Sequence, residues 1–428
     1  MREMKDSGVA WLGDIDSRFD IKAIGNLFTI KKDIIGSEPD QVLSITQRGI
    51  KIKDTTSNEG QNAASYAHYQ IVNVGDFAMN HMDLLTGWVD ISRYEGVTSP
   101  DYRVFTLTDN TQIPEYFLRV FQMYYSNRVF YAFGQGAANL GRWRLPRENF
   151  VKIAIPCPPV ELQRKIVDEI ATKVSKVDAL IANQQAQIEK LKQYKQSLIT
   201  EVVTKGLNPD APMKDSKVES IGRIPAHWIL KRAKYVATSL VKGNGITKEE
   251  VFDDGDIQCV RYGEIYSKYD CAFVSAFSKT KKEIMSSPQY ISYGDILFAG
   301  TGELVEEIGK NIVYLGTEPC LAGGDIVVMS HNQNPEYLNY ALYGACSQTQ
   351  KSRGKAKLKV VHISATEIGN VVVALPPLDE QEVIAEYLNK KCKQINRLIA
   401  IKKKKMERLG KYKRSVIYEY VTGKKEVV

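Results

Sequence analysis

One long stretch of this chain occurs twice, and that repeat constrains the fold more than any other feature. Residues 158–204 and 376–422 align without a gap, 218 residues apart, so that Gln163 corresponds to Gln381. A repeat of this length predicts that the segments preceding each copy are duplicated as well.

Each copy has the pattern of one long helix. Two prolines followed by acidic residues open it, where missing amide hydrogens cost little and the helix dipole favours negative charge. Gly206 and Gly423 suit the ends. At ~1.5 Å per residue such a helix reaches up to ~65–70 Å, about two turns of B-DNA.

Apolar residues recur within both copies in alternating steps of four and three, which predicts a coiled-coil seam. The seam residues are Val177, Ile181, Ile188, Leu191, Leu198 and Val202 in the first copy, and Ile395, Ile399, Met406, Leu409, Val416 and Tyr420 in the second. Gln184 and Lys402 interrupt the seam at one matching place, and Lys195 and Lys413 at another. Such polar interruptions can specify the register of the pair. Two equal seams in one chain most simply pair with each other; an ordinary helical hairpin or a coiled-coil homodimer is the alternative.

Composition places the chain among globular proteins with room for two or more domains. It has 428 residues, of which 43% are hydrophobic and 25% charged, and no apolar run approaches the ~18 residues of a membrane span. The N-terminal sequence does not resemble a signal peptide. The six cysteines are scattered without a CxxC pair, so we expect no disulfides, no zinc, and a cytoplasmic location without membrane contact.

The net charge of +8 is concentrated in the second helical copy. Residues 376–428 hold 14 Lys and Arg against 7 Asp and Glu. This basic character fits a solvated helix face, attraction to nucleic acid, or an acidic partner subunit.

The duplication extends to the parts that precede the helices. Residues 4–22 reappear as 213–231, with Phe19 at the position of Trp228. Strand-like runs follow in both halves, and then one helix over 113–133 in the first half and one opened by Asn334 in the second. We therefore predict an α+β chain with a pseudo-twofold internal repeat. Two similar globular segments, 1–155 and 207–373, would alternate with two long antiparallel helices, 156–206 and 374–428.

No motif for catalysis, a metal or a cofactor emerges. The tetrapeptide at 133–136 is not a methyl-donor loop, and no NPPY-like sequence is present to hold a flipped base. The glycine-rich stretch at 300–310 fails the P-loop spacing, and the five histidines are isolated. We expect a chain without intrinsic catalysis, metal or cofactor.

Basic, amide and aromatic residues in the divergent loops are candidates for DNA contacts. Arg and Lys bind phosphates, while Arg, Gln and Asn can pair with base edges. The candidates are Gln47, Arg48, Arg93, Arg103, Gln135, Asn139, Arg142, Trp143 and Arg144 in the first half, and Lys242, Asn244, Arg261, Tyr262, Lys351, Arg353, Lys355, Lys357 and Lys359 in the second.

The PPxxxQ helix starts, the repeated helices and the phrases VRYGEIY and VVHISATEIG resemble the specificity (S) subunits of type I DNA restriction–modification systems. The resemblance covers essentially the whole chain, although Leu162 stands where the second copy has Glu380 of the usual EQ pair.

This resemblance implies that each globular segment is a target-recognition domain for one half of a split, asymmetric site in double-stranded DNA. The helices would set the spacer and dock two methyltransferase subunits and, through them, restriction/translocase subunits. S-adenosylmethionine, ATP and Mg would then belong to these partners. Three alternatives stay open at this point: a stand-alone DNA methyltransferase or nuclease, a coiled-coil scaffold that binds only protein, and a general DNA-coating protein.

Overall fold

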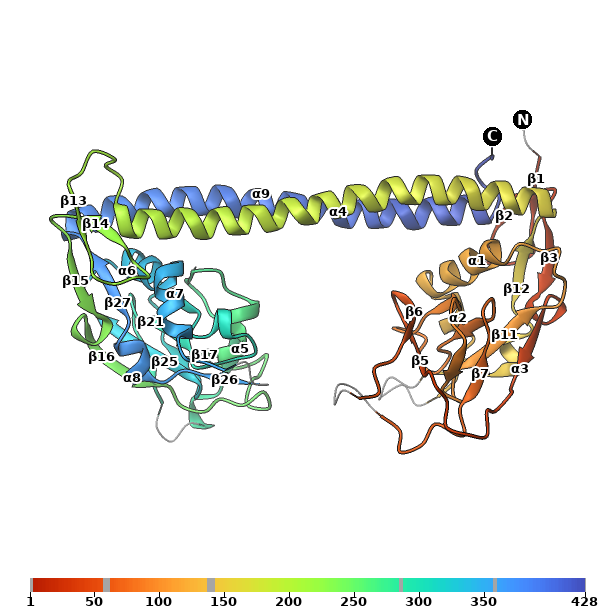
Figure 1. The fold of residues 1–428 in the computed structure, drawn as a ribbon, viewed down its shortest axis with the longest axis horizontal. Helices are drawn as coiled ribbons and strands as arrows, with labels where there is room; N and C mark the ends of the chain where they lie inside the picture. The colour runs from red at the N-terminus through yellow and green to blue at the C-terminus, as the bar shows by residue number, and fades with distance from the viewer. Residues whose placement is uncertain (1–2, 57–61, 137–142, 285–287, 357–359, 428) are drawn as a thin grey trace. The chain divides into compact units, whose positions relative to one another are not determined.

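The structure, a computed structural model, describes residues 3–56, 62–136, 143–284, 288–356 and 360–427. The chain divides into two compact units. Unit 1 comprises Met1–Gln185 and Lys404–Val428, and unit 2 comprises Ala186–Lys403. Helix α4 (Val160–Lys205) begins in unit 1 and ends in unit 2, whereas α9 (Leu378–Val421) runs from unit 2 into unit 1 (Figure 1). The predicted α+β architecture with two long helices is confirmed.

In unit 1 the two helices pack antiparallel through their seams. Lys413 of α9 donates to Asp178 of α4 at 2.7 Å, and Lys173 lies over the ring of Tyr420 at 5.7 Å. Residue numbers rise along one helix as they fall along the other, which defines the antiparallel sense. Lys413, which interrupts the apolar seam, therefore finds its counter-charge on the paired helix.

In unit 2 the equivalent lysine has a different partner. Lys195 contacts Asn396, which stands at the repeat position of Asp178, with 3.2 Å between Nζ and Oδ1. Because an amide carries no charge, the counter-charge comes instead from Asp270 in the globular part, which accepts from both Lys195 and Asn396. The lysine that interrupts the seam thus links the two helices in unit 1, and its repeat equivalent links both helices to the globular part in unit 2.

The globular part of unit 1 is built on an antiparallel sheet of order β4-β11-β8-β9, with β3–β12, β5–β6, β7–β10 and β1–β2 as separate pairs. Its strands are β1 (Met4–Asp6), β2 (Asp14–Asp16), β3 (Asp20–Ala23), β4 (Phe28–Lys31), β5 (Leu43–Thr46), β6 (Gly49–Ile52), β7 (Gln70–Val72), β8 (Phe77–Met79), β9 (Val89–Ile91), β10 (Gly96–Thr98), β11 (Arg103–Leu107) and β12 (Ala154–Cys157). Its helices are α1 (Pro114–Ser126), α2 (Val129–Ala132) and α3 (Arg147–Phe150). The main core combines the four-stranded sheet, β12 and helices α1 to α3 with Ile166 and Ile170 of α4 and Val416 and Val421 of α9, whereas β5, β6 and β7 contribute to a smaller cluster.

Unit 2 holds a mixed five-stranded sheet of order β16-β25-β21-β23-β18 and a mixed four-stranded sheet of order β19-β17-β24-β20. Its strands are β13 (Met213–Asp215), β14 (Arg223–Pro225), β15 (Ile229–Arg232), β16 (Ala237–Lys242), β17 (Ile257–Val260), β18 (Ala272–Phe273), β19 (Ser278–Thr280), β20 (Tyr290–Ile291), β21 (Ile296–Ala299), β22 (Thr301–Gly302), β23 (Asn311–Tyr314), β24 (Cys320–Ala322), β25 (Ile326–His331), β26 (Val361–His362) and β27 (Val372–Leu375). Its short helices are α5 (Tyr262–Ser267), α6 (Pro335–Tyr343), α7 (Ala345–Ser352) and α8 (Ala365–Gly369). Here too the main core includes side chains of α4 and α9, such as Val203 and Ile384.

A glutamine network joins each long helix to its globular part in the same way. Gln163 accepts from the Ile113 amide at 3.0 Å and donates to the Pro158 carbonyl at 2.8 Å. Its repeat partner Gln381 accepts from the Asn334 amide at 3.1 Å and donates to the Pro376 carbonyl at 2.9 Å. Because both glutamines are buried and fully bonded, these networks hold the long helix against the start of the first short helix.

The prediction of one continuous helix in each globular part is wrong, because each of these helices is interrupted. In unit 1, α1 ends at Ser126, and Arg128 adopts a left-handed backbone conformation (φ 58°) before α2. In unit 2, Gly344 is extended between α6 and α7, where the Ala345 amide donates to Thr200 of α4 at 2.9 Å. The predicted opening of α6 is confirmed, since Asn334 accepts from the Tyr337 amide at 3.0 Å.

None of the helices in the described part of the chain combines the length and the hydrophobicity that a membrane span requires.

Candidate nucleic-acid interface

A basic groove in unit 2 gathers several of the predicted contact residues. It has a volume of about 680 Å³ and is lined by Lys242, Arg261 and Tyr262, together with Lys248 and Lys268. Lys242 ends β16, and the Arg261–Tyr262 pair opens α5. The end of β16 and the start of α5 therefore bring three predicted residues to one surface.

Glycines allow the loops that form this groove to approach each other closely. A Cβ on Gly243 would lie 2.2 Å from the Gly323 carbonyl oxygen, and one on Gly324 would lie 2.9 Å from Gly245 Cα. A side chain at either position would therefore force the backbones apart. Asn244, also predicted as a DNA contact, lies between Gly243 and Gly245, and its backbone amide donates to the Ala322 carbonyl at 3.1 Å.

Two carboxylates temper the positive charge of the groove without cancelling it. The guanidinium of Arg261 pairs with the buried Glu264 at 2.9 Å, which orients it along the groove wall. Lys242 lies 3.5 Å from Asp325, and both side chains are largely exposed. An exposed pair of this kind contributes little free energy, so a phosphate can replace Asp325 as the partner of Lys242.

Three other predicted residues of unit 2, Lys351, Arg353 and Lys355, do not line this groove. Arg353 lines a second hollow of about 830 Å³ with Arg232. Lys355 pairs with Glu367, and Lys351 lies inside the unit, where its Nζ donates to the Gly309 carbonyl at 2.7 Å. Burial lowers the pKa of Lys351 to about 7. Its ammonium does not reach the surface in this structure, and Lys357 and Lys359 lie outside the described residues.

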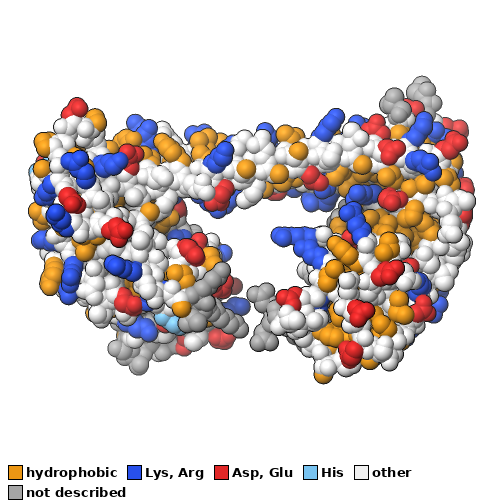
Figure 2. Space-filling model, in the orientation of Figure 1, with side chains coloured by type: hydrophobic (Ala, Val, Ile, Leu, Met, Phe, Trp, Pro, Cys, Tyr) orange, Lys and Arg blue, Asp and Glu red, His pale blue; other side chains and the backbone are white. Residues whose placement is uncertain are grey.

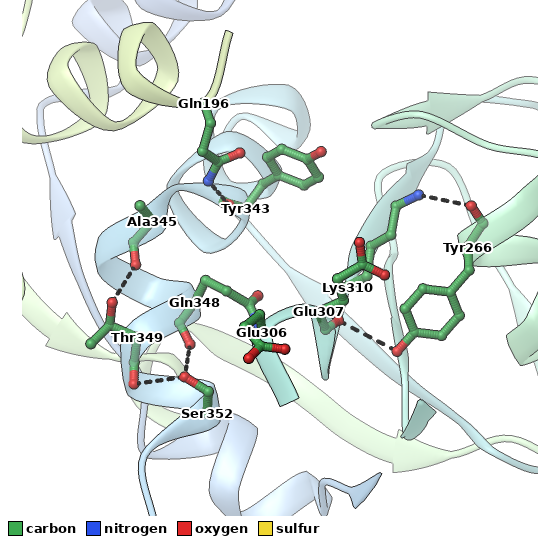
Figure 3. A pocket seen from close by; sticks show the side chains of 10 residues that line it. All are labelled: Gln196, Tyr266, Glu306, Glu307, Lys310, Tyr343, Ala345, Gln348, Thr349 and Ser352. Atoms are coloured by element: carbon green, nitrogen blue, oxygen red, sulfur yellow. Dashed lines mark hydrogen bonds between the residues drawn. The ribbon is translucent and has the colours of Figure 1, made fainter. Parts of the chain in front are cut away.

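A third hollow in unit 2, of about 480 Å³, lies beside α4 and α7 and is not suited to a phosphate (Figure 3). Glu306 and Glu307 line it. Among the described residues that line it, the one cation is Lys310, which donates to the Tyr269 carbonyl at 3.0 Å and is directed toward Tyr266 (Figure 3). Two carboxylates and an engaged lysine disfavour a polyanion there.

In unit 1 two of the predicted residues, Gln47 and Trp143, contact the turn formed by residues 83–87. Gln47, at the tip of the β5–β6 hairpin, donates to the Thr86 carbonyl at 3.1 Å. The Leu84 amide donates to the Trp143 carbonyl at 3.2 Å. Arg144 pairs with Gln135 through two backbone hydrogen bonds of 2.8 and 3.0 Å. We call Gln47, Arg48, Gln135, Trp143 and Arg144 the unit 1 loop surface; all but the half-buried Trp143 are exposed.

Arg103 supports this surface from beneath. Its Nη2 donates to the Leu145 carbonyl at 2.8 Å, its guanidinium lies 4.4 Å from the ring centre of Phe150, and burial lowers its pKa to about 10. The Leu145 amide donates to the His81 carbonyl, and burial with the charges of Arg103 and Arg144 lowers the pKa of His81 to about 3. His81 is therefore neutral at pH 7, and Arg103 lies inside the unit.

Arg93 does not join the unit 1 loop surface. Arg93 lines a separate hollow of about 590 Å³ with Asp40 and Glu95. Asn139 and Arg142 lie outside the described residues.

Lys248, Lys268 and Phe277 line the unit 2 groove but were not predicted from the sequence. Lys268 and Phe277 are nine positions apart and follow no helical or strand period, so no local pattern links them. Figure 2 shows Lys and Arg interspersed with Asp and Glu over the face in view, so charge alone does not single out these residues.

Among the described residues, no group of three or more His, Cys, Asp or Glu side chains is placed to hold a metal ion.

Comparison with known proteins gives concordant results. Residues 225–409 match the family profile described as the type I restriction modification DNA specificity domain. The MjaVIII type I restriction enzyme specificity subunit of Methanocaldococcus jannaschii is 27% identical over 284 residues, which are 65% of this chain but only 63% of that relative. A protein of the same organism, assigned as the MjaX specificity subunit, is 23% identical over 94% of this chain and 91% of its own length. A solved chain from a study of complex assembly and conformational transition of the type I R-M system shares the fold. Its TM-score is 0.66 at 15% identity, over 96% of this chain and 99% of that one.

Proposed function

This chain belongs to the family of type I restriction–modification specificity subunits, and from that premise we propose that its two units each read one half of a split, asymmetric sequence in double-stranded DNA. The observation that carries the proposal is one scaffold with two different surfaces. The Gln163 and Gln381 networks are the same, bond for bond, at the base of both units. The unit 2 groove and the unit 1 loop surface, in contrast, present different side chains, as two different half-sites require.

The chemistry would be supplied by other subunits. We propose that this chain has no catalytic role, and that S-adenosylmethionine, ATP and Mg bind to methyltransferase and restriction/translocase partners. The sequence contains no methyl-donor, base-flipping or P-loop motif, which supports this division of labour. The proposed place of action is the cytoplasm, where the DNA lies.

Mapping methylated adenines in a genome tests the proposal directly. The chain is co-expressed with its methyltransferase subunit in a host without other adenine methylation. We expect methylation at one bipartite, asymmetric motif with a constant unread spacer, and none when either protein is expressed alone. A continuous motif, or methylation by this chain alone, would contradict the proposal.

Exposed apolar residues on the long helices suit two copies of one partner. Leu180 and Tyr412 are about half exposed in unit 1, and their repeat equivalents Leu398 and Tyr194 are about half exposed in unit 2. Each unit therefore presents one leucine and one tyrosine at equivalent positions of the repeat. We propose that each such pair docks one methyltransferase subunit.

Native mass spectrometry of the co-purified complex tests this docking. Leu180→Glu or Leu398→Glu alone should reduce the bound methyltransferase subunits from two to one, and the double variant should bind none, because a buried carboxylate opposes an apolar contact. Lys192→Glu, at another exposed position of α4, serves as the control and should retain two. Two bound copies in the double variant would place the interface elsewhere.

A further inference from the structure

Phe277 is an exposed aromatic residue in the lining of the unit 2 groove. Its side chain is 65% exposed and lines the groove together with Lys242 and Arg261. Leaving a phenyl ring in water forgoes the free energy that its burial would contribute to folding. Single exposed apolar residues are common, so position and support must distinguish this one.

The loop that carries Phe277 is firmly held. The Phe277 amide donates to the Tyr269 hydroxyl at 2.7 Å, and the Ala276 amide donates to Gln258 at 2.6 Å. Burial raises the pKa of Tyr269 to about 12, so its hydroxyl stays protonated and neutral at pH 7. The Tyr269 ring packs on Phe273 with 4.8 Å between ring centres. Phe277 is therefore presented on a rigid support, which limits the entropy lost when it binds a ligand.

Lys268 restricts what the ring can contact. Its ammonium lies 4.1 Å from the centre of the Phe277 ring, within cation–π distance, and so occupies one face. Stacking of a base on that face would displace the lysine. The ring edge and the opposite face stay available, and they suit a small apolar group beside the phosphates that Lys268 and Lys242 would attract.

We infer that Phe277 contacts the C5 methyl group of a thymine in the half-site read by unit 2, and that it is a specificity-determining residue. The inference rests on the proposed function. The thymine methyl is the apolar group that DNA displays in the major groove, and phenylalanine is among the side chains that recognise it. Lys268 would hold the ring in place and bind the neighbouring backbone.

Deoxyuridine substitution tests this contact because it removes the methyl group and leaves base pairing unchanged. The complex with the methyltransferase subunit is titrated with duplexes in which each thymine of the site is replaced in turn by deoxyuridine. For the wild type we expect one position in the unit 2 half-site where binding weakens about fourfold, the effect of one methyl-sized group. The Phe277→Ala variant should bind the thymine duplex more weakly by a similar factor. Its affinity should not change when deoxyuridine replaces thymine at that position.

Val274→Ala is the matched control, because Val274 is equally exposed in the same loop but does not line the groove. It should retain the wild-type response to deoxyuridine. The inference is overturned if no thymine of that half-site is sensitive, or if Phe277→Ala keeps the wild-type sensitivity. If the wild-type complex shows no preference for a bipartite sequence, the proposed function itself fails, and this is seen before any variant is compared.

Discussion

Deleting one heptad from each long helix, residues 183–189 from α4 and 401–407 from α9, is expected to change the spacer of the methylated motif and to leave both half-sites unchanged. Each helix runs from one unit into the other, so the deletion removes about 10 Å of helix from both connections. This is about three base pairs of B-DNA, which rises 3.4 Å per base pair along each strand. A heptad is chosen because it preserves the period of the apolar seam.

The matched deletion is needed because the two helices pair antiparallel. Removing seven residues from α4 alone would shift it by about 10 Å against α9. Either Lys413 would lose Asp178 in unit 1, or Lys195 would lose Asn396 in unit 2. We therefore expect the single deletion to lower the melting temperature and abolish methylation. Methylation-motif sequencing is the measurement, and an unchanged spacer with full activity in the matched variant would refute the expectation that the helices set the spacer.

Replacing Arg144 by Ala, alone or with Arg48→Ala, is expected to relax recognition of one half-site only. Both arginines are exposed on the unit 1 loop surface, and a direct paired contact with a base contributes about 1–3 kcal/mol, or roughly 5- to 150-fold in binding. The methylated motif should become degenerate at one or two positions of the unit 1 half-site. The unit 2 half-site should stay as it is.

Lys242→Ala in unit 2 provides the contrasting control. Lys242 is an exposed cation at the groove, so its loss should weaken binding to all sequences and reduce the salt dependence by about one phosphate contact, without altering the motif. Fluorescence anisotropy at several salt concentrations measures this, and motif sequencing measures specificity. If Arg144→Ala altered both half-sites equally, the two units could not be separate readers.

A paired difference between the repeats shows what sequence comparison alone could not explain. The Trp228 indole of unit 2 donates to Glu380 at 3.1 Å. At the equivalent positions of unit 1, Phe19 and Leu162 belong to or pack against the same apolar core. A buried indole N–H needs an acceptor, whereas a phenyl ring does not. Leucine at position 162 in place of glutamate therefore goes together with phenylalanine at position 19 in place of tryptophan.

The sequence by itself determined the features that depend on local period and on repetition. The duplicated halves, the two long helices, the residues of their seam and the glycines at their ends all follow from patterns within short windows. The structure agrees on each: α4 and α9 end just before Gly206 and Gly423, both of which have positive φ, and none of the predicted seam residues is exposed.

Tertiary structure alone decided which of the predicted cations can meet a ligand. Arg103 and Lys351 read in the sequence like the exposed Arg144 and Lys242, yet both are buried and donate to backbone carbonyls. The break at Gly344 depends on contacts with α4, and the pairing of Lys268 with Phe277 depends on how two loops meet. Burial and loop proximity are set by packing between segments distant in the chain, and a local pattern of residues carries no record of that packing.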